Sequence, residues 1–148
     1  MPEKLFSLAE AEALLPRVKP LVAELQLTYA KMRAAALQVG AMVESFSEEK
    51  VDTPANPERA KYWALVKEAR EGEERVQHLV DELAFLGAEL KDFEQGLLDF
   101  RTRRDGETVY LCWKAGEERI GFWHRLDTGV AGRKPVAELR GPDRDARP

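Results

Sequence analysis

The fold of this 148-residue chain is decided by one stretch, residues 96–135, which reads GLLDFRTRRDGETVYLCWKAGEERIGFWHRLDTGVAGRKP. Asp105-Gly106 is a strong signal for a two-residue hairpin turn, because both central positions of that turn need positive φ. The pair Gly116-Glu117 fits the second common hairpin turn, in which glycine comes first. The two turns together predict a three-stranded antiparallel meander over residues 97–103, 107–114 and 118–125.

The same turns predict which side chains share a face of this meander. Outward from the first turn, Phe100 lies opposite Leu111, and outward from the second turn Leu111 lies opposite Phe122, so both registers give one continuous apolar face. On the other face Arg101, Tyr110 and Trp123 are predicted to form one cross-strand row. The apolar face is expected to hold Leu98, Phe100, Val109, Leu111, Trp113, Ile120 and Phe122, with His124 beside Val109, and the other face Asp99, Arg101, Arg103, Tyr110, Cys112, Trp123 and Arg125.

Upstream of the meander, apolar residues recur at alternating spacings of three and four, which predicts two long helices. The sequence Ser7-Leu8-Ala9-Glu10 is a capping box for the first. Pro16 and Pro20 predict a kink that separates a piece at about residues 8–15 from a longer one that reaches about residue 44. A polar loop at 45–57 follows, and Asn56 with Pro57 restarts the second helix. The second apolar seam runs from Tyr62 to Leu97.

These elements predict an α+β fold in which a coiled-coil-like antiparallel two-helix hairpin carries the β-meander on its base. The hairpin is expected to occupy residues 1–95. The meander and a glycine-rich loop are expected at 96–140, with a short strand at 136–139, in one domain with the hairpin. A flexible tail is expected at 141–148.

Composition and charge narrow the class of protein. The chain is 44 % hydrophobic and 34 % charged, has no long apolar run and carries a net charge of −4. This pattern predicts a cytoplasmic protein that does not enter a membrane. The single cysteine excludes an intramolecular disulfide. The charge is not the strongly basic one that binding to a nucleic acid backbone favours.

Only a few residues suggest chemistry. Glu117, His124 and Asp127 could together bind a metal, but their spacing matches no metal motif, and a hydrogen-bonded structural histidine is the favoured interpretation of His124. Cys112 is interpreted as a half-buried structural thiol, and His78 as a solvated residue on a helix. Arg133 and Lys134 could bind an anion, although the loop TGVAGRKP also fits a simple structural turn.

The motifs of the C-terminal part resemble a known family. They are Leu98-Asp99-Phe100, Leu111-Cys112-Trp113, Gly116-Glu117, Trp123-His124 and the stretch from Gly129 to Pro135, preceded by the opening FSLAEAEALLPRVKPLV. Together they resemble a prokaryotic family catalogued as domain of unknown function 2203. One departure is Val130, where an aromatic residue is expected before Ala-Gly-Arg. The resemblance implies a helical N-terminal part and a cytoplasmic location, and it brings no activity, cofactor or catalytic residue.

Two hypotheses of different classes follow. The first is a non-enzymatic module that binds another macromolecule or assembles with itself, as a homodimer for example. The alternative is a small-molecule, anion or metal site on the outer face of the sheet beneath the loop 127–135, with a catalytic role left open. No catalytic residue and no cofactor are assigned. The candidate ligand or interface residues are Asp99, Arg101, Tyr110, Trp123, His124 and Arg133.

Overall fold

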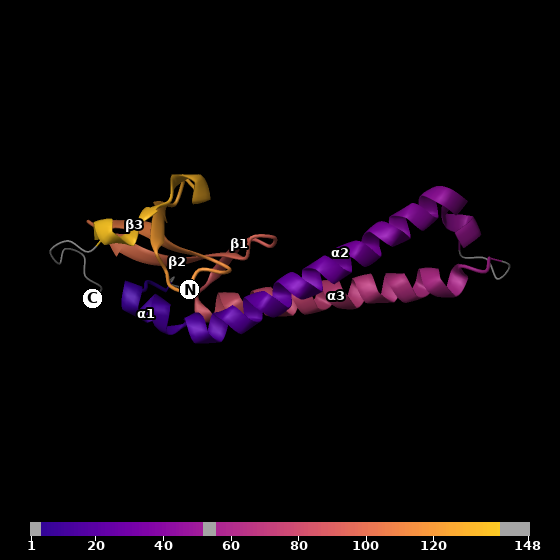
Figure 1. Cartoon of the computed structure of the whole chain (residues 1–148), viewed down its shortest axis with the longest axis horizontal. Coiled ribbons are helices and arrows are strands. Elements are labelled where there is room, and N and C mark those ends of the chain that lie inside the picture. Colours follow the sequence, from indigo (N-terminus) through magenta and orange to yellow (C-terminus); the bar gives the residue numbers. More distant parts are fainter. Residues whose placement is uncertain (1–3, 52–55, 140–148) are drawn as a thin grey trace. The chain divides into compact units, whose positions relative to one another are not determined.

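The computed structural model describes residues 4–51 and 56–139 (Figure 1). The chain combines helices with one five-stranded antiparallel sheet, whose strands follow their order in the sequence. It divides into two compact units: a sheet unit formed by Met1–Ala23 and Val80–Pro148, and a helical unit formed by Glu24–Leu79. The elements are α1 (Leu8–Ala13), α2 (Leu15–Val51), α3 (Arg59–Leu86), β1 (Glu89–Asp92), β2 (Leu97–Arg104), β3 (Glu107–Lys114), β4 (Phe122–Arg125), η1 (Val130–Gly132), β5 (Lys134–Pro135) and η2 (Val136–Leu139).

The first hairpin of the sheet agrees with the prediction from the sequence. β2 pairs with β3 so that Phe100 lies opposite Leu111. Asp105 and Gly106 have φ values of 51° and 80°, which are the positive values that the two-residue turn requires.

The second turn was predicted wrongly. The amide of Glu117 donates to the carbonyl of Lys114 at 2.9 Å, so the turn is centred on Ala115 and Gly116. Gly116 has φ +100° at the third position, as in a type II turn, rather than at the second position of a hairpin turn. The chain then continues irregularly until β4 begins at Phe122, four residues later than expected.

The register between β3 and β4 therefore differs from the prediction by one residue. Leu111 lies opposite Trp123 instead of Phe122, and Tyr110 lies opposite His124. Because side chains alternate between the faces of a strand, this shift moves every residue of β4 to the face opposite the expected one.

The sheet also has two strands that were not predicted. Residues 89–92 were expected in the second helix, but they form β1, which pairs with β2. The short strand expected at 136–139 is the 3-10 helix η2, while β5 at Lys134–Pro135 pairs with β4.

α3 ends earlier than predicted because of Gly87. This glycine has φ +97°. The amide of Ala88 donates to the carbonyl of Leu83, and that of Gly87 to Ala84, which together form a Schellman motif. A Cβ on Gly87 would lie 2.5 Å from the ring of Phe6, so this position has room only for glycine.

The N-terminal helices contact the sheet within the sheet unit. The capping box at Ser7 and Glu10 is present as predicted. The ring of Phe6 packs edge-on against Phe100, with centroids 5.6 Å apart. Glu12 accepts a hydrogen bond from the amide of Ile120 at 3.2 Å. These contacts place α1 over the face of the sheet that carries Phe100.

The prolines act differently from the expected kink. The helix is interrupted at Leu14, so that α1 stops before Pro16, and Pro20 lies inside α2 without ending it. α2 continues to Val51, beyond the predicted end near residue 44. Of the loop predicted at 45–57, residues 52–55 lie outside the described residues, as does the tail predicted at 141–148.

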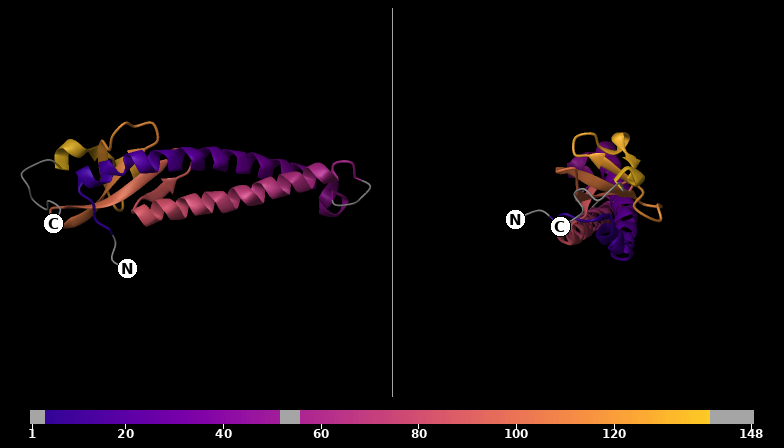
Figure 2. Two further views of the ribbon diagram at one scale, coloured as in Figure 1. Left: turned by 90° about the horizontal axis from the view of Figure 1, so that it is seen from below. Right: turned by 90° about the vertical axis from the view of Figure 1, so that its left-hand side faces the viewer.

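In the helical unit α2 and α3 run antiparallel side by side, and Figure 2 shows this pair from two further directions. Leu25, Val76 and Leu79 are buried. Gly72 allows a close approach, because a Cβ there would lie 2.8 Å from the Cβ of Met32. None of the described helices combines the length and apolar character needed to cross a bilayer.

Candidate functional site

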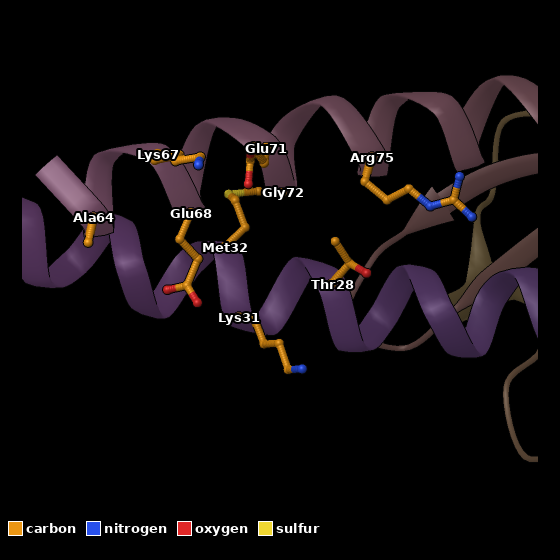
Figure 3. A pocket seen from close by; sticks show the side chains of 9 residues that line it. All are labelled: Thr28, Lys31, Met32, Ala64, Lys67, Glu68, Glu71, Gly72 and Arg75. Carbon is orange, nitrogen blue, oxygen red and sulfur yellow. The ribbon is translucent and has the colours of Figure 1, made fainter.

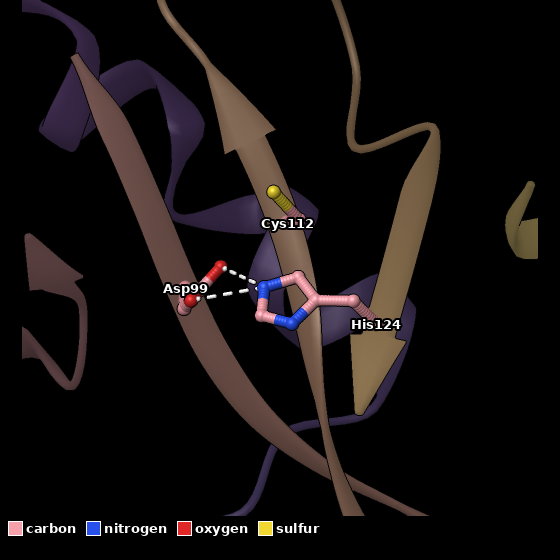
Figure 4. Close-up of side chains that lie close together, drawn as sticks. All are labelled: Asp99, Cys112 and His124. Carbon is pink, nitrogen blue, oxygen red and sulfur yellow. Dashed lines mark hydrogen bonds and ion pairs between the residues drawn. The ribbon is translucent and has the colours of Figure 1, made fainter. Parts of the chain in front are cut away.

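A buried polar cluster lies on the face of the sheet opposite the one that carries Phe100. It consists of Asp99 from β2, Cys112 from β3 and His124 from β4, which are 1 %, 0 % and 2 % exposed. Figure 4 shows the three side chains converging from neighbouring strands. Their potential ligand atoms all lie within 4.8 Å of one another.

Both ring nitrogens of His124 have oxygen partners. Nδ1 lies 2.7 Å from the carbonyl oxygen of Arg125, which can only accept, so Nδ1 is the donor of this bond. Nε2 lies 3.0 and 3.1 Å from the two carboxylate oxygens of Asp99. The imidazole is thus held at one nitrogen by the backbone, while the other is directed at the carboxylate.

The environment of the cluster disfavours isolated negative charge. Burial raises the pKa of Asp99, and the neighbouring His124 only partly offsets this effect. Burial also raises the pKa of Cys112 to about 12, helped by the nearby Asp99 carboxylate. Without a bound cation, Cys112 is therefore a neutral thiol at physiological pH.

A partly exposed polar network, formed by Glu89, Lys91, Arg101 and Tyr110, adjoins the cluster. Tyr110 donates to Glu89 at 2.8 Å, and Arg101 donates to the other oxygen of Glu89 at 2.7 Å. Lys91 lies over the ring of Tyr110, 4.3 Å from its centroid, and 4.0 Å from Asp99 Oδ2. These contacts connect the polar network to the buried carboxylate of Asp99.

The charges of Glu89 and Lys91 in this polar network are stabilised by their partners. Burial alone would raise the pKa of Glu89, but hydrogen bonds from Arg101 and Tyr110 outweigh it, and the net pKa is lowered. Burial would likewise lower the pKa of Lys91, but the hydrogen bond to Tyr110 and nearby negative charges raise it. The charged groups of the polar network are therefore paired with one another at neutral pH.

The predicted row of Arg101, Tyr110 and Trp123 is only partly correct. Arg101 and Tyr110 lie opposite each other, but the third member of their row is His124. Trp123 is buried on the other face. The correction has the same cause as the register shift, because one residue of slip exchanges the faces of Trp123 and His124.

Arg133, predicted to bind an anion, and Glu117, predicted as a metal ligand, are not members of the cluster, although both lie close enough to Cys112 to affect its pKa. Arg133 forms an ion pair with Glu117, with Nη2 2.7 Å from Oε2, and its guanidinium stacks on Phe122 at 4.0 Å. Asp127 is exposed. The structure thus brings together Asp99, Arg101, Tyr110 and His124 of the candidate residues, and adds Glu89, Lys91 and Cys112.

Two of these additions could not be found from the pattern of the sequence. Glu89 and Lys91 were expected on a helix, and only the glycine at 87 indicates an end of the helix before them. Cys112 was placed on the correct face, but its proximity to His124 depended on the register of β4.

The helical unit contains a separate hollow of about 500 Å³ between α2 and α3 (Figure 3). It is open to solvent and its lining is mostly charged, with Lys31 from α2 and Lys67, Glu68, Glu71 and Arg75 from α3. At one end Arg75 is paired with Glu24, with Nε 2.6 Å from Oε2. These side chains carry mixed charge and select no one class of ligand.

α2 also carries an exposed apolar stripe that the sequence analysis missed. It consists of Leu27, Ala30, Ala34 and Leu37, spaced by three, four and three residues, and all four are exposed. The spacing itself was visible in the sequence. It was overlooked because a stronger apolar seam runs along the same helix.

A comparison with protein families matches residues 4–136 to the family described as "Uncharacterized conserved protein (DUF2203)". Comparisons with curated proteins and with solved structures gave no significant match. The family match covers the Asp99–Cys112–His124 cluster and the exposed stripe on α2.

Proposed function

We propose that this chain, which belongs to the DUF2203 family of uncharacterised conserved proteins, is a non-enzymatic binding module that assembles with a second copy of itself through α2. The observation that carries the proposal is the exposed apolar stripe formed by Leu27, Ala30, Ala34 and Leu37. Isolated exposed leucines are common on protein surfaces, but a regular stripe along one helix indicates a partner.

The stripe lies on the side of α2 that faces away from α3. At 3.6 residues per turn, it is roughly opposite the buried Leu25 and the contact residue Met32. α2 therefore has two apolar seams, of which α3 covers one. Leu27 is 58 % exposed and Leu37 is 68 % exposed, which are high values for leucine on a helix that already has a core face.

A second copy is the occupant that the pattern favours. The order Leu27, Ala30, Ala34, Leu37 is the same in both directions about its midpoint. An antiparallel pair related by a two-fold axis therefore brings each Leu27 against Leu37 of the other copy, and each Ala30 against Ala34. The alanines allow the two helix backbones to approach closely.

The charges beside the stripe oppose this arrangement slightly. Lys31 and Arg33 flank its centre, and in the antiparallel pair each lies near its own equivalent. Exposed like-charge pairs cost a few tenths of a kcal/mol each and are screened by salt. The dimer is therefore expected to become tighter as the salt concentration rises.

The expected affinity is modest. Twice the summed exposed fractions of Leu27 and Leu37 corresponds to about two and a half leucine side chains. Their burial contributes roughly 4–8 kcal/mol, with a smaller addition from the alanines. Association itself costs about 4–15 kcal/mol, so the favourable end of this balance leaves about 4 kcal/mol, and a dissociation constant of about 1 mM is expected.

Sedimentation equilibrium across a wide range of protein concentration tests the proposal. The parent is expected to dimerise, and Leu37→Glu to remain monomeric with an unchanged helix content. Leu126→Glu is the matched control, because Leu126 is also a half-exposed leucine but lies in the sheet unit. The proposal is wrong if the parent stays monomeric at millimolar concentration. It is also wrong if Leu27→Glu and Leu37→Glu both still dimerise as the parent does.

Cross-linking then tests the orientation in a Cys112→Ser background. Antiparallel pairing predicts a disulfide between Ala30→Cys and Ala34→Cys chains when the two are mixed. Efficient cross-linking of Ala34→Cys with itself would instead show that the helices pair in parallel and that the two-fold arrangement given above is wrong.

A further inference from the structure

We propose that the Asp99–Cys112–His124 cluster is a binding site for a divalent transition metal ion of the zinc class. The site lies in the sheet unit and is independent of the self-association surface on α2. It requires one carboxylate oxygen, one thiolate and one imidazole nitrogen from three adjacent strands.

The donor set fits such an ion. Zinc and its neighbours in the first transition row bind imidazole and thiolate together with carboxylate, whereas calcium and magnesium select oxygen ligands alone. Cys112, His124 and Asp99 supply one donor of each kind.

The orientation of His124 also fits. A ligating histidine usually donates its second ring N–H to a carbonyl or carboxylate, which fixes the tautomer and aims the other nitrogen at the metal. Nδ1 of His124 has this contact with the carbonyl of Arg125 at 2.7 Å. Nε2 is thereby presented to the centre of the cluster, beside the two oxygens of Asp99.

The distances require only a small adjustment. Donor atoms bonded to one tetrahedral zinc lie about 3.3–3.5 Å apart, as follows from metal–ligand bonds of about 2.0 Å to nitrogen or oxygen and 2.3 Å to sulfur. Nε2 of His124 and Oδ1 of Asp99 are 3.0 Å apart. The three ligand atoms are all within 4.8 Å, so rotation of the Cys112 side chain brings its sulfur into range.

Charge balance favours the ion in this buried position. When the ion binds, two protons leave to solvent: the thiol proton of Cys112 and the proton that Nε2 of His124 shares with the carboxylate of Asp99. One divalent ion with one thiolate, one carboxylate and a neutral imidazole has no net charge, which removes most of the penalty for burying the groups. Three protein ligands leave a fourth coordination position for water or a small ligand.

The test uses the full chain after removal of metals with a chelator. Zinc affinity is measured by competition with a chromophoric chelator, and the ligand set by the absorption spectrum with Co²⁺. The parent is expected to bind one equivalent and to show a sulfur-to-cobalt charge-transfer band. Cys112→Ser should lose this band and bind at least about tenfold more weakly.

Two variants separate ligation from folding. Asp99→Asn can still hydrogen-bond to His124, so it should keep the fold and the charge-transfer band while it weakens zinc binding at least about tenfold. His78→Ala removes a histidine on α3 and should bind as the parent does. Sub-stoichiometric binding by the parent, or binding that Cys112→Ser leaves unchanged, would overturn the proposal and leave the cluster as a structural hydrogen-bonded group.

Discussion

Substituting each of two helical glycines by alanine should change the free energy of unfolding in opposite directions. Gly40 lies in α2 and Gly72 in α3, both within the helical unit. An added Cβ at Gly40 meets no atom within 4 Å, whereas at Gly72 it would lie 2.8 Å from Cβ of Met32. Two carbon atoms that are not bonded to each other do not come as close as 2.8 Å, so one of the helices would have to move.

The magnitudes follow from two known effects. Alanine is favoured over glycine inside a helix by about 1 kcal/mol, so Gly40→Ala should stabilise the protein by roughly 0.5–1 kcal/mol. Gly72→Ala gains the same propensity but adds overpacking, which typically costs about 1–3 kcal/mol. The two variants should therefore differ by roughly 1–3 kcal/mol, with Gly72→Ala the less stable.

Urea unfolding followed by circular dichroism measures this difference. The protein concentration should stay near about 1 µM, below the dissociation constant expected for the dimer, because Gly40 flanks the exposed stripe. If both substitutions stabilise the protein equally, α2 and α3 do not approach closely at Gly72. The face of α2 that carries the stripe would then no longer be defined, and the proposed interface would fail with it.

Three further predictions test the sheet unit. Because the pKa of Glu89 is lowered in the folded state, its contribution to stability is present above about pH 4.5 and is lost as the pH falls through the folded pKa. Between about pH 6 and pH 3, the urea midpoint of the parent should therefore fall more than that of Glu89→Gln. If the two midpoints fall equally with pH, the prediction is wrong. Trp123→Phe and Trp113→Phe both remove buried volume, but the indole N–H of Trp123 has no hydrogen-bond partner among the described residues, whereas that of Trp113 donates to a carbonyl, so Trp113→Phe should cost about 1 kcal/mol more. Equal losses in urea titrations of the two would refute this distinction. Lys91→Met removes a cation 4.0 Å from Asp99 and should tighten zinc binding up to about fivefold, and weaker binding would show that the lysine assists the site.

The sequence was sufficient where a local rule was strict. Asp105-Gly106 has few conformations other than its hairpin turn, so the pairing of β2 with β3 could be derived residue by residue. The capping box at Ser7 is equally local, because its two hydrogen bonds join residues three apart.

Glycine was ambiguous where its role depended on distant residues. Gly72 and Gly87 both lie between the first and last residues of the second apolar seam, yet one lies inside α3 and the other ends it. What distinguishes them is tertiary: Gly72 adjoins Met32, and Gly87 adjoins Phe6. No local pattern contains either contact, and so β1 with Glu89 and Lys91 was assigned to a helix.

The candidate metal site shows how such a distant contact reaches function. Glu12 and Lys19 hold the connection between β3 and β4, through the amide of Ile120 and the carbonyl of Glu118. These bonds support an irregular connection in place of a two-residue turn. The length of that connection decides which side chains of β4 face Asp99, because faces alternate along a strand. With the shorter turn, tryptophan would face the carboxylate in place of histidine, and the sheet would present no imidazole to the thiol. Two side chains of the N-terminal helices thus help to build a cluster whose three members lie on three other elements.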